Sequence, residues 1–231
     1  MRIAGLQKLT LLDYPGITAC TVFTAGCNFR CPFCQNGSLV RPGEAEEACT
    51  GDELLAFLKK RAGLLDGVCF SGGEPLLQPD LAEWMARAKA LGYRVKLDTN
   101  GSFPGRLRAL VERGLVDYVA MDVKNSPEKY AETAGLRLLD LAAVRESAAY
   151  LLSRPVEYEF RTTVVREFHE REDFLAIGRW IRGAERYFLQ GFVDSGDLLR
   201  SGLHACTPEE MRGFLAAARE GIPAAQLRGI E

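Results

Sequence analysis

The chain has 231 residues, of which 47% are apolar and 26% are charged, and its formal net charge is −2. This composition is typical of a globular chain of one or two domains, and it excludes an extended disordered chain. The small charge excludes a general attraction to nucleic acid or anionic lipid, and no apolar run approaches the roughly 18 residues of a membrane span.

Segments with strand patterns and segments with helix patterns alternate along the chain. Thr50 is expected to begin a helix, because Glu53 completes a capping box three residues later, and Thr207 begins a second capping box with Pro208 at the first helical position. In chain order, the patterns predict strands at 18–23, 67–70, 94–97, 116–123, 156–165 and 186–192, and helices at 50–58, 81–91, 107–114, 138–151, 174–181 and from 207 onward.

Six strands that alternate with helices predict a parallel α/β sheet. Periodicity alone leaves open whether this sheet is doubly wound or closed toward a barrel, but in both cases functional sites gather at the carboxyl ends of the strands. We expect a single domain over residues 1–231, with a core at about 18–195 and a C-terminal helical extension at about 196–231.

Seven cysteines are present, and three of them, Cys27, Cys31 and Cys34, fall within eight residues. The N-terminal residues 1–8 lack the apolar core of a signal peptide, so we expect a cytoplasmic protein. In a reducing compartment, a dense cysteine cluster indicates metal binding or catalysis rather than disulfide bonds.

The cluster has the spacing C-x3-C-x2-C and directly follows the first predicted strand, and Gly26 and Pro32 favour a loop over a helix. Three soft thiolate ligands suit an iron–sulfur cluster with one iron left open for another ligand. Two alternatives remain at this point: a structural zinc site, which normally needs a fourth ligand, and a redox pair formed by Cys31 and Cys34.

Other candidate residues follow the ends of later predicted strands. The segment 71–75 (SGGEP) could be a simple turn, although the bare backbone of Gly72 and Gly73 would also let carbonyl groups approach an ammonium closely. Asp122 and Lys124 alternate with apolar neighbours on a strand that is otherwise buried, so they are either paired with each other or functional.

The motif C-x3-C-x-aromatic-C, with Phe33 before the last cysteine, resembles the signature of the radical S-adenosylmethionine (SAM) superfamily. The flanking segments 13–16 (DYPG), 23–28 (FTAGCN) and 34–36 (CQN) are similar to those of glycyl radical enzyme activases. The similarity is greatest to the longer form of the proteins that activate anaerobic ribonucleoside-triphosphate reductase. It covers most of the chain and weakens beyond about residue 195.

The resemblance implies a partial (β/α)6 barrel and specific roles for residues of this chain. Cys27, Cys31 and Cys34 would hold a [4Fe-4S] cluster, and the Gly-Gly-Glu segment would bind the amino group of SAM. Asp98 and Asp122 would hold a monovalent cation beside the SAM carboxylate. The residues implied in cofactor binding are Phe33, Gly72, Gly73, Glu74, Asp98, Thr99, Asn100, Asp122, Lys124, Arg161 and Gln190.

The activity implied is reductive cleavage of SAM to a 5′-deoxyadenosyl radical, which takes hydrogen from a glycine of a partner enzyme. The expected partners are a glycyl radical enzyme, such as anaerobic ribonucleotide reductase, and a flavodoxin- or ferredoxin-type electron donor, without membrane or nucleic acid. At 13–18 (DYPGIT) the chain differs from the DGPGIR of activases of the pyruvate formate-lyase type. Two alternatives are a small-molecule enzyme similar to 7-carboxy-7-deazaguanine synthases and a zinc-binding module without catalysis.

Overall fold

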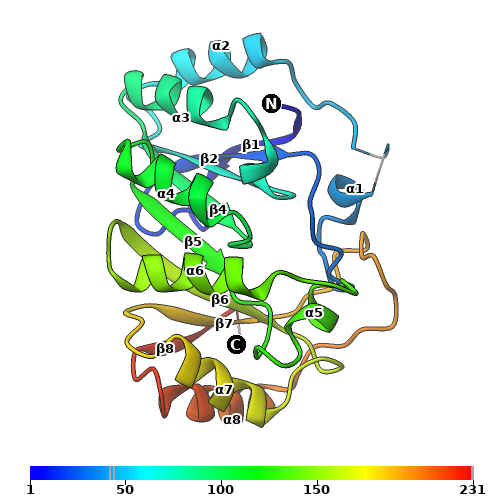
Figure 1. The fold of residues 1–231 in the computed structure, drawn as a ribbon. Helices are drawn as coiled ribbons and strands as arrows, with labels where there is room; N and C mark the ends of the chain where they lie inside the picture. Colours follow the sequence, from blue (N-terminus) through cyan, green and yellow to red (C-terminus); the bar gives the residue numbers. More distant parts are fainter. Residues whose placement is uncertain (42, 44, 230–231) are drawn as a thin grey trace.

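Eight strands form one sheet, in the order β1 to β8, in the computed structural model, which describes residues 1–41, 43 and 45–229 (Figure 1). β1 (Ile3–Thr10) pairs with β2 (Ala19–Thr24) in the antiparallel sense, and each following pair is parallel. The other strands are β3 (Gly67–Gly72), β4 (Arg94–Thr99), β5 (Tyr118–Asp122), β6 (Glu157–Val164), β7 (Tyr187–Gly191) and β8 (Ala225–Arg228). The predicted parallel α/β sheet is confirmed, and the six predicted strands are β2 to β7.

Helices connect the parallel strands and cover the outer face of the curled sheet, with α2 and α3 at one end and α7 and α8 at the other (Figure 1). Both predicted capping boxes are present, at Thr50 and Thr207. Leu138 lies outside its predicted helix and is 92% exposed, because the side chain of Asp140 caps that helix at its start. The helices are α1 (Gly37–Val40), α2 (Gly51–Arg61), η1 (Pro75–Leu77), α3 (Leu81–Ala90), α4 (Pro104–Glu112), α5 (Tyr130–Thr133), α6 (Leu141–Leu152), α7 (Arg171–Trp180) and α8 (Pro208–Arg219).

Two strands of the sheet, β1 and β8, lie outside the core predicted at about 18–195. β8 falls in the segment that was expected to be only helical, and its short, polar sequence gives little strand signal. It is held in part by Arg228, which donates hydrogen bonds of 2.9 Å to both carboxylate oxygens of the buried Glu159 on β6. The last two residues of the predicted extension, 230 and 231, lie outside the described residues.

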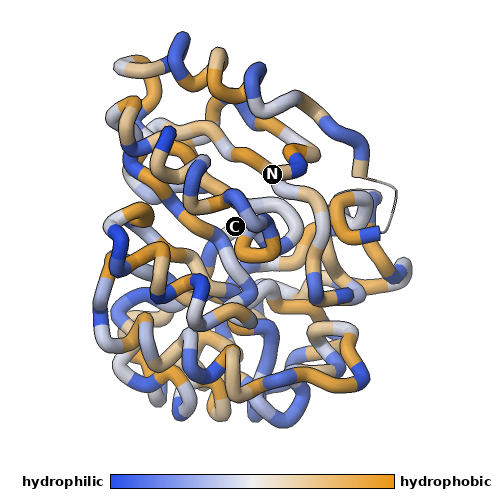
Figure 2. The backbone as a smooth tube through the Cα atoms, turned by 45° about the horizontal axis from the view of Figure 1, so that its top comes forward, coloured by the Kyte–Doolittle hydropathy of each residue, from blue (hydrophilic) through white to orange (hydrophobic). Residues whose placement is uncertain are grey.

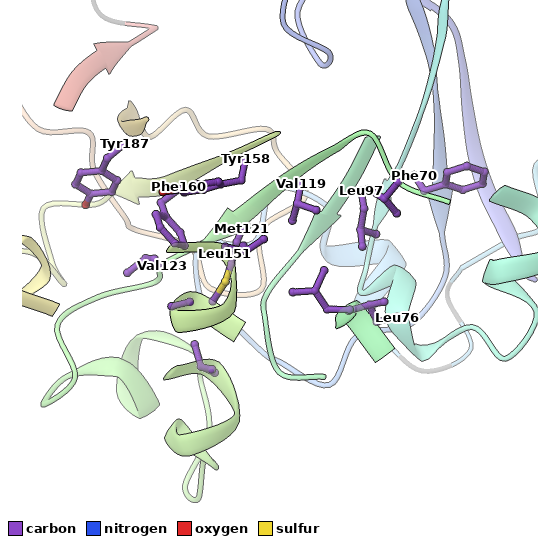
Figure 3. Packing of buried hydrophobic residues seen from close by; sticks show 14 of the residues in the cluster. Phe70, Leu76, Leu97, Val119, Met121, Val123, Leu151, Tyr158, Phe160 and Tyr187 are labelled. Atoms are coloured by element: carbon purple, nitrogen blue, oxygen red, sulfur yellow. The ribbon is translucent and has the colours of Figure 1, made fainter. Parts of the chain in front are cut away.

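The main core lies between the sheet and its helices. Phe70, Leu97, Val119 and Phe160 are fully buried and come from four successive parallel strands, β3 to β6 (Figure 3). Along the chain, hydrophobic and hydrophilic residues alternate in the helices, as expected for helices with one buried face (Figure 2). Burying each large side chain contributes about 1.5–3 kcal/mol. Among the described residues, no helix has both the length and the apolar content for a membrane crossing.

A second, smaller cluster lies on the inner face of the sheet, near the amino ends of the strands. Tyr14, from the segment between β1 and β2, is 1% exposed, and its ring lies 5.8 Å from that of Tyr118 on β5. Tyr118 and Ala120 share the inner face with Asp122, because alternate residues of a strand point to the same side. The segment that contains Tyr14 therefore packs against the end of the sheet opposite to the carboxyl ends.

Candidate functional site

A cavity of about 250 Å³ lies at the carboxyl ends of the parallel strands. It is bounded by the loop after β2, the Gly-Gly turn after β3 and the ends of β4 to β7. This is the location that the parallel α/β pattern predicts for a functional site. The predicted residues that line it are Cys27, Cys31, Phe33, Cys34, Gly72, Gly73, Asp98, Thr99, Asn100, Asp122, Lys124, Arg161 and Gln190.

The cysteine loop has no regular secondary structure, as predicted, and backbone hydrogen bonds brace it from several sides. Gly26 has a positive φ of 90°, which favours glycine, and its carbonyl oxygen accepts a hydrogen bond of 2.8 Å from the Glu74 backbone nitrogen. The Arg30 nitrogen donates to the carbonyl oxygen of Ala134 at 2.9 Å. The loop is therefore tied to the turn after β3 and to the end of α5, and these contacts set its path past the cavity.

The three thiols face the cavity, and their burial disfavours the charged thiolate form. Burial raises the pKa of Cys27 to about 12 and that of Cys31 to about 11, and it also raises the pKa of Cys34. The Cys27 sulfur accepts hydrogen bonds from the Phe29 nitrogen at 3.3 Å and from Asn100 Nδ2 at 3.8 Å. Sulfur ligands of iron–sulfur clusters commonly accept such bonds, which tune the cluster.

The donor set fits a four-iron cluster. Over the part of the chain that the structure describes, no three His, Cys, Asp or Glu side chains are grouped so as to hold a single metal ion. Three cysteines on one irregular loop, all facing the same cavity, supply three of its four iron ligands.

Glu74 is the one predicted site residue that does not line the cavity. Its side chain is fully buried, and its carboxylate accepts hydrogen bonds from the Leu76 nitrogen at 3.0 Å, from Thr99 Oγ1 at 2.9 Å and from the Asn100 nitrogen at 2.8 Å. Burial raises the pKa of Glu74 to about 7, against the opposing effect of these hydrogen bonds. The carboxylate therefore joins the turn after β3 to the end of β4, while Gly72 and Gly73 present bare backbone to the cavity.

Asp98 and Asp122 form a buried ionic network with Arg161. The guanidinium of Arg161 lies 3.0 Å from Asp122 Oδ1 and 3.5 Å from Asp98 Oδ2, so it bridges the ends of β4 and β5. Lys124 Nζ lies 2.9 Å from Asp122 Oδ2. Burial alone would raise the pKa of Asp122, but Arg161 and Lys124 lower it to about 2. The pKa of Asp98 is likewise lowered, since Arg161 and a second cation outweigh its burial.

That second cation is Lys96, which sequence reasoning missed. Lys96 lies on β4, two residues before Asp98 and on the same face, is 0% exposed, and its ammonium pairs with Asp98 Oδ1. Burial opposes its charge, but Asp98 raises the pKa of Lys96 overall. The sequence contains one signal for this ion pair, a lysine inside the strand 94–99 (RVKLDT). Lysine is almost never fully buried unless it is paired, so a lysine in a buried strand indicates a nearby carboxylate.

The remaining predicted residues occupy the rim of the cavity. Asn100 Nδ2 donates to Asn28 Oδ1 at 2.9 Å, so it ties the end of β4 to the cysteine loop. The ring of Phe33 is buried and lies 5.7 Å from that of Phe168, and Gln190 lies at the end of β7. The cavity is also lined by residues that were not predicted: Phe29, Gln35, Asn36, Val40, Ser71 and Thr163.

Comparison with known proteins connects this site to a family. A model of the Radical SAM superfamily matches residues 21–181. A protein of Methanocaldococcus jannaschii named "Putative glycyl-radical enzyme activating enzyme" is 33% identical over 198 residues, which cover 82% of this chain and 79% of that protein. The 7-carboxy-7-deazaguanine synthase of Koribacter versatilis is 31% identical over 158 residues, which cover 67% of this chain and 65% of the synthase.

The fold has counterparts among solved structures. Streptococcus suis SuiB, bound to the precursor peptide SuiA, superposes with a TM-score of 0.71 at 12% identity, over 90% of this chain and 48% of SuiB. At that identity the likeness concerns the fold alone. The superfamily model, however, spans most of the chain, from β2 to the end of α7, and it includes the cysteine loop and the parts of β3 to β6 that line the cavity. The chain is therefore an enzyme that belongs to the radical SAM superfamily.

Proposed function

We propose that the chain activates a glycyl radical enzyme, such as anaerobic ribonucleotide reductase, by reductive cleavage of SAM. The observation that carries this proposal is that all three cysteines of the C-x3-C-x2-C loop face one cavity together with the ends of the parallel strands. The relative from M. jannaschii, matched over most of its length, bears the name of a glycyl-radical enzyme activating enzyme. We propose a cytoplasmic location, because thiolate-held clusters need a reducing compartment.

Enzymes of this superfamily use a [4Fe-4S] cluster and SAM. In this chain, Cys27, Cys31 and Cys34 would hold the cluster, and one iron would stay free for SAM. When bound, the two groups would supply reductive cleavage of the C5′–S bond of SAM: one external electron would give methionine and a 5′-deoxyadenosyl radical, which would become 5′-deoxyadenosine by taking a hydrogen atom from a glycine of the partner.

The chain's own residues would bind SAM and shape its surroundings. The backbone of Gly72 and Gly73 can approach the SAM amino group closely, because neither residue carries a side chain. Lys124 and Arg161 line the cavity and can attract the SAM carboxylate. Phe33, Thr99, Asn100 and Gln190 lie around the same space and would contact the rest of the molecule.

Residues 13–18 are where this chain differs from activases of the pyruvate formate-lyase type. In this segment, Tyr14 packs against Tyr118, and Thr21 Oγ1 donates a hydrogen bond of 2.5 Å to Asp13 Oδ2. The buried position of Tyr14 leaves its side chain unable to contact a partner directly, unlike a side chain on the surface. We propose that a flavodoxin- or ferredoxin-type protein supplies the electron.

The test has two stages under strictly anaerobic conditions. Reconstituted protein with dithionite and SAM should form 5′-deoxyadenosine. Addition of the reductase subunit should then produce a glycyl radical signal in electron paramagnetic resonance. Formation of 5′-deoxyadenosine without any radical on several candidate partners would overturn the activase assignment while it leaves SAM cleavage in place.

A second candidate function is supported by the similarity to the K. versatilis synthase. An enzyme of that kind would act on a small molecule and would need no protein partner. Production of 7-carboxy-7-deazaguanine by the purified chain, without a partner protein, would decide for this function.

A further inference from the structure

The two aspartates that the resemblance assigns to a monovalent cation already have cationic partners from the chain itself. Oδ1 of Asp98 pairs with Lys96, and its Oδ2 pairs with Arg161 at 3.5 Å. Oδ1 of Asp122 pairs with Arg161 at 3.0 Å, and its Oδ2 pairs with Lys124 at 2.9 Å. Each of the four carboxylate oxygens is therefore ion-paired with a side-chain nitrogen.

Of the three cationic partners of these aspartates, Lys96 is the one that has no contact with the cavity. Its side chain is fully buried on the face of β4 that also carries Asp98, and it does not itself line the cavity. Besides Asp98, its ammonium contacts only the weak acceptor Sγ of Cys69, at 3.8 Å, among the hydrogen bonds of the described residues. A buried ammonium is costly unless it is paired. The ion pair with Asp98 is therefore the main interaction that stabilises Lys96 in this position.

A bound sodium or potassium ion would not fit beside this arrangement. Such an ion needs oxygen ligands, but one oxygen of Asp98 faces the ammonium of Lys96, and the other faces the Arg161 guanidinium and accepts a hydrogen bond of 2.9 Å from Ser71 Oγ. The Asp98 carboxylate already faces two positive charges, those of Lys96 and Arg161, and a metal cation would be a third, repelled by both at short range. The residues present therefore do not fit a resident monovalent cation as long as Lys96 is charged and in place.

We propose that the Lys96 ammonium is a built-in substitute for the monovalent cation, so that SAM binding in this chain needs no added sodium or potassium. The inference rests on the proposed binding of SAM in this cavity. Three cationic side chains, Lys96, Lys124 and Arg161, face Asp98 and Asp122, and the nearby carboxylate of Glu159 is paired with Arg228, so one positive charge is in excess in this group. This excess complements the carboxylate of SAM without any external ion. Lys96 is thus a positioning residue that acts through Asp98.

The experiment compares salts. The reconstituted protein is prepared in tetramethylammonium chloride, whose cation is too large for the site, and in potassium or sodium chloride. The dissociation constant of SAM is measured by equilibrium dialysis, and cleavage is measured as 5′-deoxyadenosine. For the wild-type protein we expect both quantities to agree within about twofold among the salts.

The variant Lys96→Met keeps most of the buried side chain but removes the ammonium. In tetramethylammonium chloride it should bind SAM at least about tenfold more weakly than wild type, and potassium or sodium should restore binding. A purely structural role for Lys96 predicts no such rescue. Lys60→Met is the matched control, because Lys60 is an exposed lysine on α2 and its loss should change neither quantity.

The outcomes are separable. Wild-type protein that binds SAM at least about tenfold more weakly without potassium or sodium would overturn the inference but leave the proposed function intact. Lys96→Met that folds and binds SAM like wild type in every salt would also overturn it. If Lys96→Met does not fold, as judged by thermal unfolding, the wild-type comparison decides alone. Absence of SAM binding in all salts would overturn the proposed function, and this inference with it.

Discussion

The backbone nitrogen of Glu74 donates a hydrogen bond of 2.8 Å to the carbonyl oxygen of Gly26, the residue immediately before Cys27. This bond joins the turn after β3 directly to the cysteine loop. The neighbouring Gly73 allows the close approach, since a Cβ added there would lie 1.9 Å from the same Gly26 oxygen. The proposed binding loops for SAM and for the cluster are therefore in direct backbone contact.

Gly73→Ala should disrupt this contact. The added methyl group must push the cysteine loop away, at a cost of about 1–3 kcal/mol in the free energy of unfolding. We expect a lower iron content after reconstitution and a lower unfolding midpoint. Gly105→Ala on α4 is the control, because a Cβ there meets nothing within 4 Å. Equal iron content in Gly73→Ala and wild type would contradict the argument.

Replacing Cys27, Cys31 or Cys34 by alanine should remove one of the three proposed iron ligands. Each variant should lose most of its iron and sulfide and should form no 5′-deoxyadenosine above background. Cys49→Ala should behave like wild type, because Cys49 lies outside the cavity. Iron and sulfide analysis with product detection by chromatography makes the comparison, and cleavage that persists in any of the three variants would falsify the ligand assignment.

Glu74 should make stability depend on pH. Because burial raises its pKa from 4.5 to about 7, its contribution is fully present below about pH 4.5 and is lost as the pH rises through about 7. The linkage amounts to about 3 kcal/mol. Glu74→Gln lacks this titration, so its free energy of unfolding relative to wild type should increase across that interval. Urea unfolding of the unloaded proteins measures the difference, and a constant difference would show that Glu74 stays ionised throughout.

Arg161 should be coupled energetically to Asp122. Arg161→Met leaves both aspartates with one cationic partner fewer, and we expect it to destabilise the protein by about 3 kcal/mol. Asp122→Asn removes one of the two carboxylate charges that Arg161 faces, so the double variant should be clearly more stable than the sum of the single effects predicts. Denaturant unfolding of all four proteins gives the coupling. Additivity to within about 0.5 kcal/mol would indicate that the two residues act independently.

The alternating strands and helices could be predicted because their signals are local. The capping boxes at Thr50 and Thr207 lie within four residues of sequence, and the run at β6 is long and rich in β-branched and aromatic residues. β1 was missed, because register shifts interrupt its pairing with β2 and its polar and apolar residues alternate weakly. β8 has four residues, too few to give a periodic pattern.

In the site, the predicted residues that line the cavity came from the cysteine loop and from the resemblance to the radical SAM activases, and most of them follow strand ends, which a parallel sheet places at one location. The partners of those residues were harder to predict. The inward position of Glu74 and the pairing of Lys96 with Asp98 depend on distances between strands, and these appear only when the chain has folded. A buried ion pair of this kind leaves little trace in the sequence beyond one unexpected charge in an apolar strand.

The pairing of Arg228 with Glu159 has a consequence for the order of folding. The two residues are 69 positions apart, so a growing chain contains Glu159 well before Arg228. If β2 to β7 assemble first, as elements near the N-terminus can do during synthesis, they enclose a carboxylate without its cationic partner. Docking of β8 neutralises that charge. The last strand of the sheet thus completes the interior of the protein, and the nascent chain reaches its full stability only after this strand has joined.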